Sequence, residues 1–171
     1  MSERGILRLR EVKNVKAQRL EAQLLAMSSY VLRRLNQVNE ARQRIDAAFK
    51  LLSETKDYPT DRIVLLDETE VVLRAWGAHL AETGQTQRAA DVYQELLDKV
   101  VAMHPDPTND LRNTTGMSRI YEALATLHLR NGNVVQSQSM SALRLALWQT
   151  WNRKLPQNVY VQHQLAAASH Q

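Results

Sequence analysis

The chain has 171 residues and a net charge of +4, contains no cysteine, and is poor in glycine, proline and phenylalanine. The lack of cysteine excludes disulfides and thiolate metal ligands, and no apolar run approaches the roughly 18 residues of a membrane-spanning helix. Abundant Leu, Ala, Gln, Arg and Glu favour helix over strand, so we predict one all-α domain. Because the first residues lack the apolar segment of a signal peptide, we expect a soluble cytoplasmic protein.

The positive charge is concentrated at the N-terminus. The first twenty residues hold six basic and two acidic side chains, whereas the acids and bases of the remaining chain balance. Such a segment can bind nucleic acid or an acidic surface. Its apolar residues spread around most of a helix surface, however, and this favours a solvated helix that packs on the structure after it. These apolar residues are Ile6, Leu7, Leu9, Val12 and Val15.

Helical periodicity predicts seven helices along the chain. We expect them at residues 10–35, 39–56, 61–83, 87–104, 109–130, 134–154 and 158–169. Asn39 is the predicted N-cap of the second helix, and Thr60 or Asp61 that of the third. The first helix carries a mainly apolar stripe that we expect to face the core. Its members are Leu20, Leu24, Leu25, Ser28, Val31, Leu32 and Leu35.

The helix pattern repeats at a spacing of 48 residues. The break at residues 35–37 aligns with breaks at 83–85 and 131–133. A small residue precedes each break and another follows it: Ser29, Gly77 and Ala125 before, and Ala41, Ala89 and Ser137 after. A fixed period of this size marks stacked units that cannot bury their apolar faces alone. We therefore predict three helix pairs and a terminal helix, at residues 13–60, 61–108, 109–156 and 158–169.

The second unit carries a recognisable pattern in Leu73, Trp76, Gly77, Leu80, Gly84, Ala89, Tyr93 and Pro105. This pattern resembles the tetratricopeptide repeat. The resemblance implies a right-handed α-solenoid of antiparallel helix pairs, packed through small residues that face large ones. The period is longer than the roughly 34 residues usual for this repeat, which implies extra helical turns in each unit. The segment from Leu147 to Asn158 is also similar to the end of repeat regions in some bacterial serine/threonine protein kinases, which implies a regulatory tail.

In tetratricopeptide-repeat proteins, the first helix of each pair lines a concave groove that holds an extended peptide or a helix. The resemblance implies that a partner binds first-helix residues that face away from the second helix. These residues are Gln23, Tyr30, Arg33, Arg34, Arg74, Ala78, Glu82, Arg119, Glu122, Thr126 and Arg130. Arginine predominates, and because its planar guanidinium suits carboxylates, an acidic segment is the preferred ligand. The alternative is a solvated face on which Glu82 and Glu122 form ion pairs with the arginines.

Catalytic, cofactor and metal motifs do not occur in the sequence. It lacks a glycine-rich phosphate loop, His-Glu-x-x-His and Gly-x-Ser-x-Gly. The five histidines are isolated and are interpreted as surface or boundary residues. The cluster of Asp106, Asn109 and Asp110 lacks the glycine and glutamate of a calcium loop, so we expect it to cap a helix. Three tryptophans, Trp76, Trp148 and Trp151, are interpreted as core or cap residues.

The favoured hypothesis is a non-catalytic interaction scaffold or regulatory module that binds a protein or peptide and needs no cofactor or metal. One alternative is a ligand-sensing regulatory domain of a larger signalling protein, such as a kinase. Another is binding of nucleic acid or an acidic surface through residues 4–19, which the interpretation of the N-terminal helix disfavours. Because a repeat array without a polar cap can stack end to end, we also consider a homodimer through Trp148, Trp151 and the last helix.

Overall fold

The computed structural model describes the backbone of residues 3–170 and the side chains of residues 14–170. Over these residues the secondary structure is entirely helical, which confirms the all-α prediction. The helices are α1 (Glu3–Arg34), α2 (Val38–Glu54), α3 (Glu68–Glu82), α4 (Thr86–Val101), α5 (Leu111–Arg130), α6 (Val134–Lys154) and α7 (Val159–Ser169). None of them is both long and apolar enough to cross a lipid bilayer.

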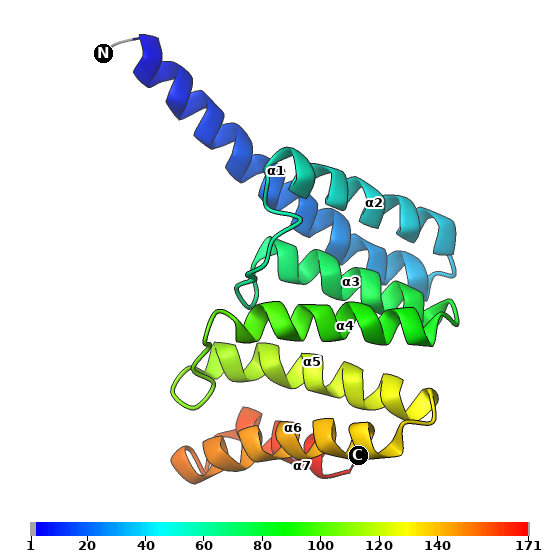
Figure 1. The fold of residues 1–171 in the computed structure, drawn as a ribbon. Coiled ribbons are helices and arrows are strands. Elements are labelled where there is room, and N and C mark those ends of the chain that lie inside the picture. Colours follow the sequence, from blue (N-terminus) through cyan, green and yellow to red (C-terminus); the bar gives the residue numbers. More distant parts are fainter. Residues whose placement is uncertain (1–2, 171) are drawn as a thin grey trace.

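Consecutive helices pack against each other. The most extensive contacts are those of α1 with α2, α3 with α4, and α5 with α6, and α1 also packs on α3, α4 on α5, and α7 on α6. Figure 1 shows the helices stacked one after another, with the first turns of α1 projecting beyond the stack. The side chains in the projecting turns lie outside the described residues, so the predictions made for Ile6, Leu7, Leu9 and Val12 stay untested. Of the later residues in that segment, Val15 is half-buried and Lys16 is exposed.

Three tight turns repeat one backbone conformation at the predicted spacing. Asn36, Gly84 and Gly132 have φ angles of 59°, 81° and 79°, in the left-handed region. The N–H of the residue after each one donates to a carbonyl five residues back, over 2.9 Å from Gln37 to Leu32, 2.9 Å from Gln85 to Leu80 and 2.8 Å from Asn133 to His128. This is the hydrogen bond of a helix that ends in a left-handed residue, which is usually glycine and sometimes asparagine. The predicted period of 48 residues is therefore present in the backbone.

Small residues lie buried where paired helices meet. All six small residues that flank the three breaks are buried: Ser29, Ala41, Gly77, Ala89, Ala125 and Ser137. At Gly77 the fit is close, because a Cβ atom added there would lie 2.6 Å from Cε2 of Tyr93. The Tyr93 hydroxyl donates to the carbonyl of Arg74 over 3.1 Å, which holds the ring against α3. At this point a small residue of α3 therefore faces a large residue of α4.

The apolar stripe expected to face inward on α1 does so only in part. Leu20, Leu24, Val31 and Leu35 are each more than half exposed, while Leu25 and Leu32 are half-buried. The side that faces α2 and α3 carries mainly small residues, and Ala22, Ala26 and Ser29 are fully buried there. Among the described side chains of α1, Arg33 is the one large side chain that is buried on this side. Small side chains let the neighbouring helices approach α1 closely, and the large leucines are left on the open side.

The third helix begins later than predicted. Asp67, rather than Thr60 or Asp61, is its N-cap, and the Asp67 carboxylate accepts the N–H of Glu70 over 2.8 Å. The residues before it form a connection in which Ile63 is buried and donates its N–H to the carbonyl of Lys99 over 3.2 Å. The connection therefore packs against α4 instead of extending the helix.

Other predicted helix ends shift by smaller amounts. The second helix begins at Val38 and its N-cap position is Gln37, so Asn39 does not cap it. The fourth helix ends at Val101 rather than near residue 104. The fifth begins at Leu111, where Asp110 accepts the N–H of Arg112 over 2.7 Å and so caps the helix as predicted. Asp106 instead binds Thr108 and Asn109 within the preceding loop, and these hydrogen bonds lower its pKa.

The C-terminal tryptophans belong to the core of this chain. Trp148 is fully buried and Trp151 nearly so, in a cluster with Val161 and Ala168 of α7. The indole Nε1 of Trp148 donates to the Ser118 hydroxyl over 2.8 Å. The core interpretation is confirmed. Because α7 covers the two rings, they are not exposed, and a dimer through the C-terminal end stays a prediction.

Trp76 and His79 stack on each other in α3, close to Arg42 of α2. Trp76 is half-buried, its ring stacks on that of His79 at 5.7 Å, and the guanidinium carbon of Arg42 lies 4.0 Å from its centroid. His79 is buried, so its interpretation as a surface or boundary residue is wrong. Its Nδ1 atom has no hydrogen-bond partner. Burial, with smaller contributions from the nearby charges of Arg33 and Arg42, lowers the pKa of His79, while Glu82 and Asp46 oppose this shift.

We expect acid to destabilise the fold partly through His79. Because the folded state lowers the pKa of this imidazole, the unfolded chain binds the proton first as pH falls below about 6.5. The stabilisation from neutral His79 is therefore complete above that pH and is lost as pH falls toward the folded-state pKa. The measurement is urea denaturation of the wild type and His79→Gln at pH 7.5 and 5.5. The wild type should lose more stability between the two pH values than the variant, and His163→Gln, at an exposed site, is the control. Equal losses in all three proteins would contradict the prediction.

Candidate binding groove

Two adjoining hollows run along the faces of α1, α3 and α5. Their volumes are about 770 and 410 Å³, within the range of ligand-binding pockets. Each hollow is lined by Tyr30, Arg74, Ala78, Glu82 and Arg119. Because these five residues border both, the hollows form one continuous groove that spans the first helix of each predicted pair.

The structure brings all eleven predicted site residues to this groove. Gln23, Arg33 and Arg34 line the first hollow, and Glu122, Thr126 and Arg130 line the second, on either side of the five shared residues. Their placement follows from the 48-residue period, which puts equivalent positions of α1, α3 and α5 on one face. Whether they bind a partner stays a prediction.

Sequence reasoning missed the apolar part of the groove lining. Met27, Val31, Leu66 and Val71 line the first hollow, and Ala81, Tyr93, Ala123 and Leu127 the second. Val31 had been placed on the inward side of α1, and Leu66 within the third helix. Met27 lies three residues before Tyr30, and Val31 lies three residues before Arg34. This spacing was a usable signal, because residues three or four apart share a helix face.

Several charged side chains of the groove already have ion-pair partners. Arg33 is buried, lies with Nε 2.7 Å from a carboxylate oxygen of Glu82, and donates to the carbonyl of Ala75 over 3.1 Å. Arg33 thus links α1 to α3 and is less open to a ligand than predicted. Glu122 lies 3.0 Å from a guanidinium nitrogen of Arg144, on α6. Glu82 and Glu122 therefore do form ion pairs, as the alternative interpretation expected, although Arg144 was not among the predicted residues.

Arg74 forms its ion pair with a carboxylate below the groove surface. Its Nε donates over 2.8 Å to Glu70, which is fully buried. Burial raises the pKa of Glu70, and the charge of Arg74 opposes this rise only in part. Burial also raises the pKa of Tyr30, whose ring lies 4.5 Å from the guanidinium of Arg33. The floor of the groove thus holds ionisable side chains in a poorly hydrated setting, where electrostatic interactions are strengthened.

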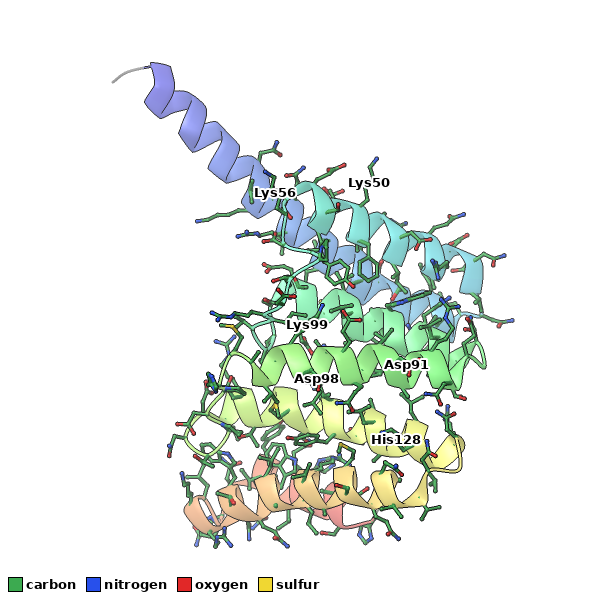
Figure 2. The ribbon with its side chains drawn as sticks, in the orientation of Figure 1. Lys50, Lys56, Asp91, Asp98, Lys99 and His128 are labelled. Atoms are coloured by element: carbon green, nitrogen blue, oxygen red, sulfur yellow. The ribbon has the colours of Figure 1, made fainter. Side chains whose placement is uncertain are left out.

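Three groove arginines are left without an ion pair. Arg34, Arg119 and Arg130 are exposed and make no hydrogen bond or ion pair with any described side chain. Outside the groove, by contrast, α2 and α4 present charges of both signs, with Lys50 on α2 and Asp91, Asp98 and Lys99 on α4 (Figure 2). Lys99 there pairs with Glu95 over 2.6 Å. On these two helices charges of both signs are therefore interspersed, whereas arginine predominates in the groove lining.

No family model matches the chain, and neither a curated protein nor a solved structure matches it. Among the described residues, no group of three histidine, aspartate or glutamate side chains is placed to hold a metal ion. The geometry and charge of the groove are therefore the basis of the function proposed below.

Proposed function

We propose that this chain is a non-catalytic, tetratricopeptide-like interaction module whose groove binds an acidic segment of another protein. In this proposal the three helix pairs form a right-handed α-solenoid, and the first helices of the pairs form the binding face. The repeated turns at Asn36, Gly84 and Gly132 and the close contact of Gly77 with Tyr93 support this architecture.

The observation that carries the binding proposal is the set of three unpaired arginines along one continuous groove. Arg34, Arg119 and Arg130 come from two helices and border hollows that also offer apolar surface. Guanidinium groups bind carboxylates with two parallel hydrogen bonds, and such charge-assisted contacts are about twice as strong as neutral ones. An acidic side chain would supply the partner that the described residues do not.

We expect the variant Arg34→Gln, Arg119→Gln, Arg130→Gln to weaken binding of an acidic peptide at least tenfold. The probe is a fluorescent 15-residue peptide of alternating glutamate and glycine, measured by fluorescence anisotropy at low salt. The reason is the loss of charge-assisted contacts, each contributing roughly 1.5–3 kcal/mol. A matched control carries Arg44→Gln, Arg62→Gln and Arg112→Gln, which removes the same charge from exposed sites outside the groove. Equal affinity in the two variants would mean that only net charge matters and would overturn the proposal.

A further inference from the structure

An apolar stripe on α1 is left uncovered in this structure. The α1 stripe consists of Leu20, Leu24, Met27, Val31 and Leu35, each between 54% and 64% exposed. Single exposed apolar residues are common on protein surfaces, but a contiguous apolar patch marks an interaction site. The first four lie on successive turns of α1 and Leu35 directly follows its last residue. The part of the chain that the structure describes does not cover them.

The stripe is continuous with the groove. Met27 and Val31 belong to the stripe and also line the first hollow, together with Arg34, Arg74 and Arg119. A ligand seated in that hollow would therefore meet arginine on one side and the stripe on the other. Leu20, Leu24 and Leu35 extend the apolar surface beyond the hollow in both directions along α1.

The spacing of the stripe suits a helix better than an extended chain. Leu20, Leu24, Met27 and Val31 are separated by four, three and four residues, which is the spacing of the seam between two coiled helices. A second helix presents its own side chains at the same spacing and can interdigitate with them. An extended segment presents side chains on one face at every second residue, which does not match a helical turn.

Charge along the stripe distinguishes between two helical partners. Lys16 and Arg34 are 18 residues apart, which is about five full turns, so they lie on one line along α1 beside the stripe. Both are exposed. A second copy of this chain packed antiparallel would bring its own Lys16 and Arg34 to the same edge, where like charges repel. A partner helix with acidic residues along that edge would be attracted instead.

We propose that the α1 stripe and the first hollow together bind an acidic amphipathic helix of a partner protein. Its apolar face packs on Leu20, Leu24, Met27 and Val31, and its acidic edge faces Lys16, Arg34 and Arg119. This inference rests on the proposed function, which requires only an acidic ligand in the groove. It adds the conformation of that ligand and a binding surface outside the eleven predicted residues.

The test uses two synthetic peptides of 21 residues. The helical probe has three heptads with leucine at positions a and d and glutamate at e and g, so that repulsion between glutamates keeps its copies apart. The non-helical probe has the same sequence except that three residues are replaced by proline, which prevents helix formation. Binding is measured by fluorescence anisotropy, and the helicity of the bound peptide by circular dichroism.

The stripe variant carries Leu20→Ser, Leu24→Ser and Leu35→Ser, all outside the hollow, and its control carries Leu129→Ser, Val135→Ser and Val159→Ser at other exposed apolar positions. We expect the helical probe to bind the wild type at least tenfold more tightly than the non-helical probe does. The affinity of the helical probe should fall at least tenfold for the stripe variant and should not change for the control variant. The non-helical probe should bind the stripe variant and the wild type equally. Circular dichroism of each variant verifies that it is folded.

The outcomes separate this inference from the proposed function. The inference is overturned if the helical probe binds the stripe variant as tightly as the wild type, or if it binds the wild type no more tightly than the non-helical probe does. In either case, weaker binding of either peptide to the variant Arg34→Gln, Arg119→Gln, Arg130→Gln would still support the groove as a binding site. If neither peptide binds, or the arginine variant binds both normally, the proposed function fails as well. A wild-type dimer in sedimentation velocity that dissociates in the stripe variant would assign the stripe to a second copy, and would also overturn the inference.

Discussion

Replacing Trp148 with alanine is expected to lower the free energy of unfolding by about 3–5 kcal/mol. The side chain is fully buried in the cluster that joins α5, α6 and α7. Its ring meets that of Tyr160 edge to face at a centroid distance of 5.8 Å. The substitution removes the largest buried side chain of this cluster and leaves a cavity whose walls can close only partly. It also removes the hydrogen-bond donor to Ser118, whose hydroxyl lies in a buried setting.

Urea denaturation followed by circular dichroism at 222 nm would measure this loss. Trp148→Phe is the matched variant, because it keeps an aromatic ring but lacks the indole N–H. We expect it to cost less than Trp148→Ala, in the range of about 1–3 kcal/mol. Hydrogen exchange in the alanine variant should rise most in α6 and α7, which contain or contact this cluster. A change of less than about 1 kcal/mol on Trp148→Ala would mean that α7 does not pack here in solution.

Introducing leucine at Gly77 is expected to destabilise the protein by about 3 kcal/mol, the upper part of the usual range for overpacking. Even a Cβ atom there would lie 2.6 Å from Cε2 and 2.8 Å from Cδ2 of Tyr93. The ring cannot rotate away at no cost, because Tyr93 is buried and its hydroxyl binds the carbonyl of Arg74. Either α3 and α4 separate or the ring leaves its site. The gain in helix propensity on replacing glycine, about 1 kcal/mol, offsets only part of this cost.

Thermal and urea denaturation would measure the effect, with Ala142→Leu on the exposed side of α6 as control. The control should change stability by no more than about 0.5 kcal/mol. A double-mutant cycle with Tyr93→Ala tests the cause. If the ring is the obstacle, Gly77→Leu should cost much less in the Tyr93→Ala background than in the wild type. A neutral Gly77→Leu in the wild type would remove the basis for pairing α3 with α4 through these residues.

The predicted groove and the observed one agree in position but not in every role. The period put equivalent positions of three helices on one face, and all eleven residues lie there. Some arginines predicted to bind a ligand instead form ion pairs within the chain. Ion pairing depends on side chains that are distant in sequence, so it could not be predicted from local patterns. Arg33 is separated from Glu82 by about one full unit, and Glu122 takes its partner from α6. No local pattern distinguishes a buried, paired arginine such as Arg33 from its exposed neighbour Arg34.

The first helix illustrates why apolar periodicity can mislead. Leu20, Leu24, Val31 and Leu35 follow a helical spacing that is typical of a core face, yet they are exposed. The period shows only that a helix has an apolar side. It does not tell whether that side meets the same chain or a partner. The same residues that make this prediction wrong are those on which the proposed helix-binding surface depends.

The sequence by itself determined the helical class, the repeat spacing and the chemistry of the three turns. These follow from local properties, since glycine or asparagine accepts a left-handed backbone wherever it stands and a small residue leaves room wherever helices cross. Only the tertiary structure decided which side of α1 is buried, where α3 begins, and which groove arginines lack an ion pair. Each of those depends on how closely particular helices approach: α2 and α3 pack on the small residues of α1 and leave its leucines outside, and the connection before α3 is held on α4 by Ile63.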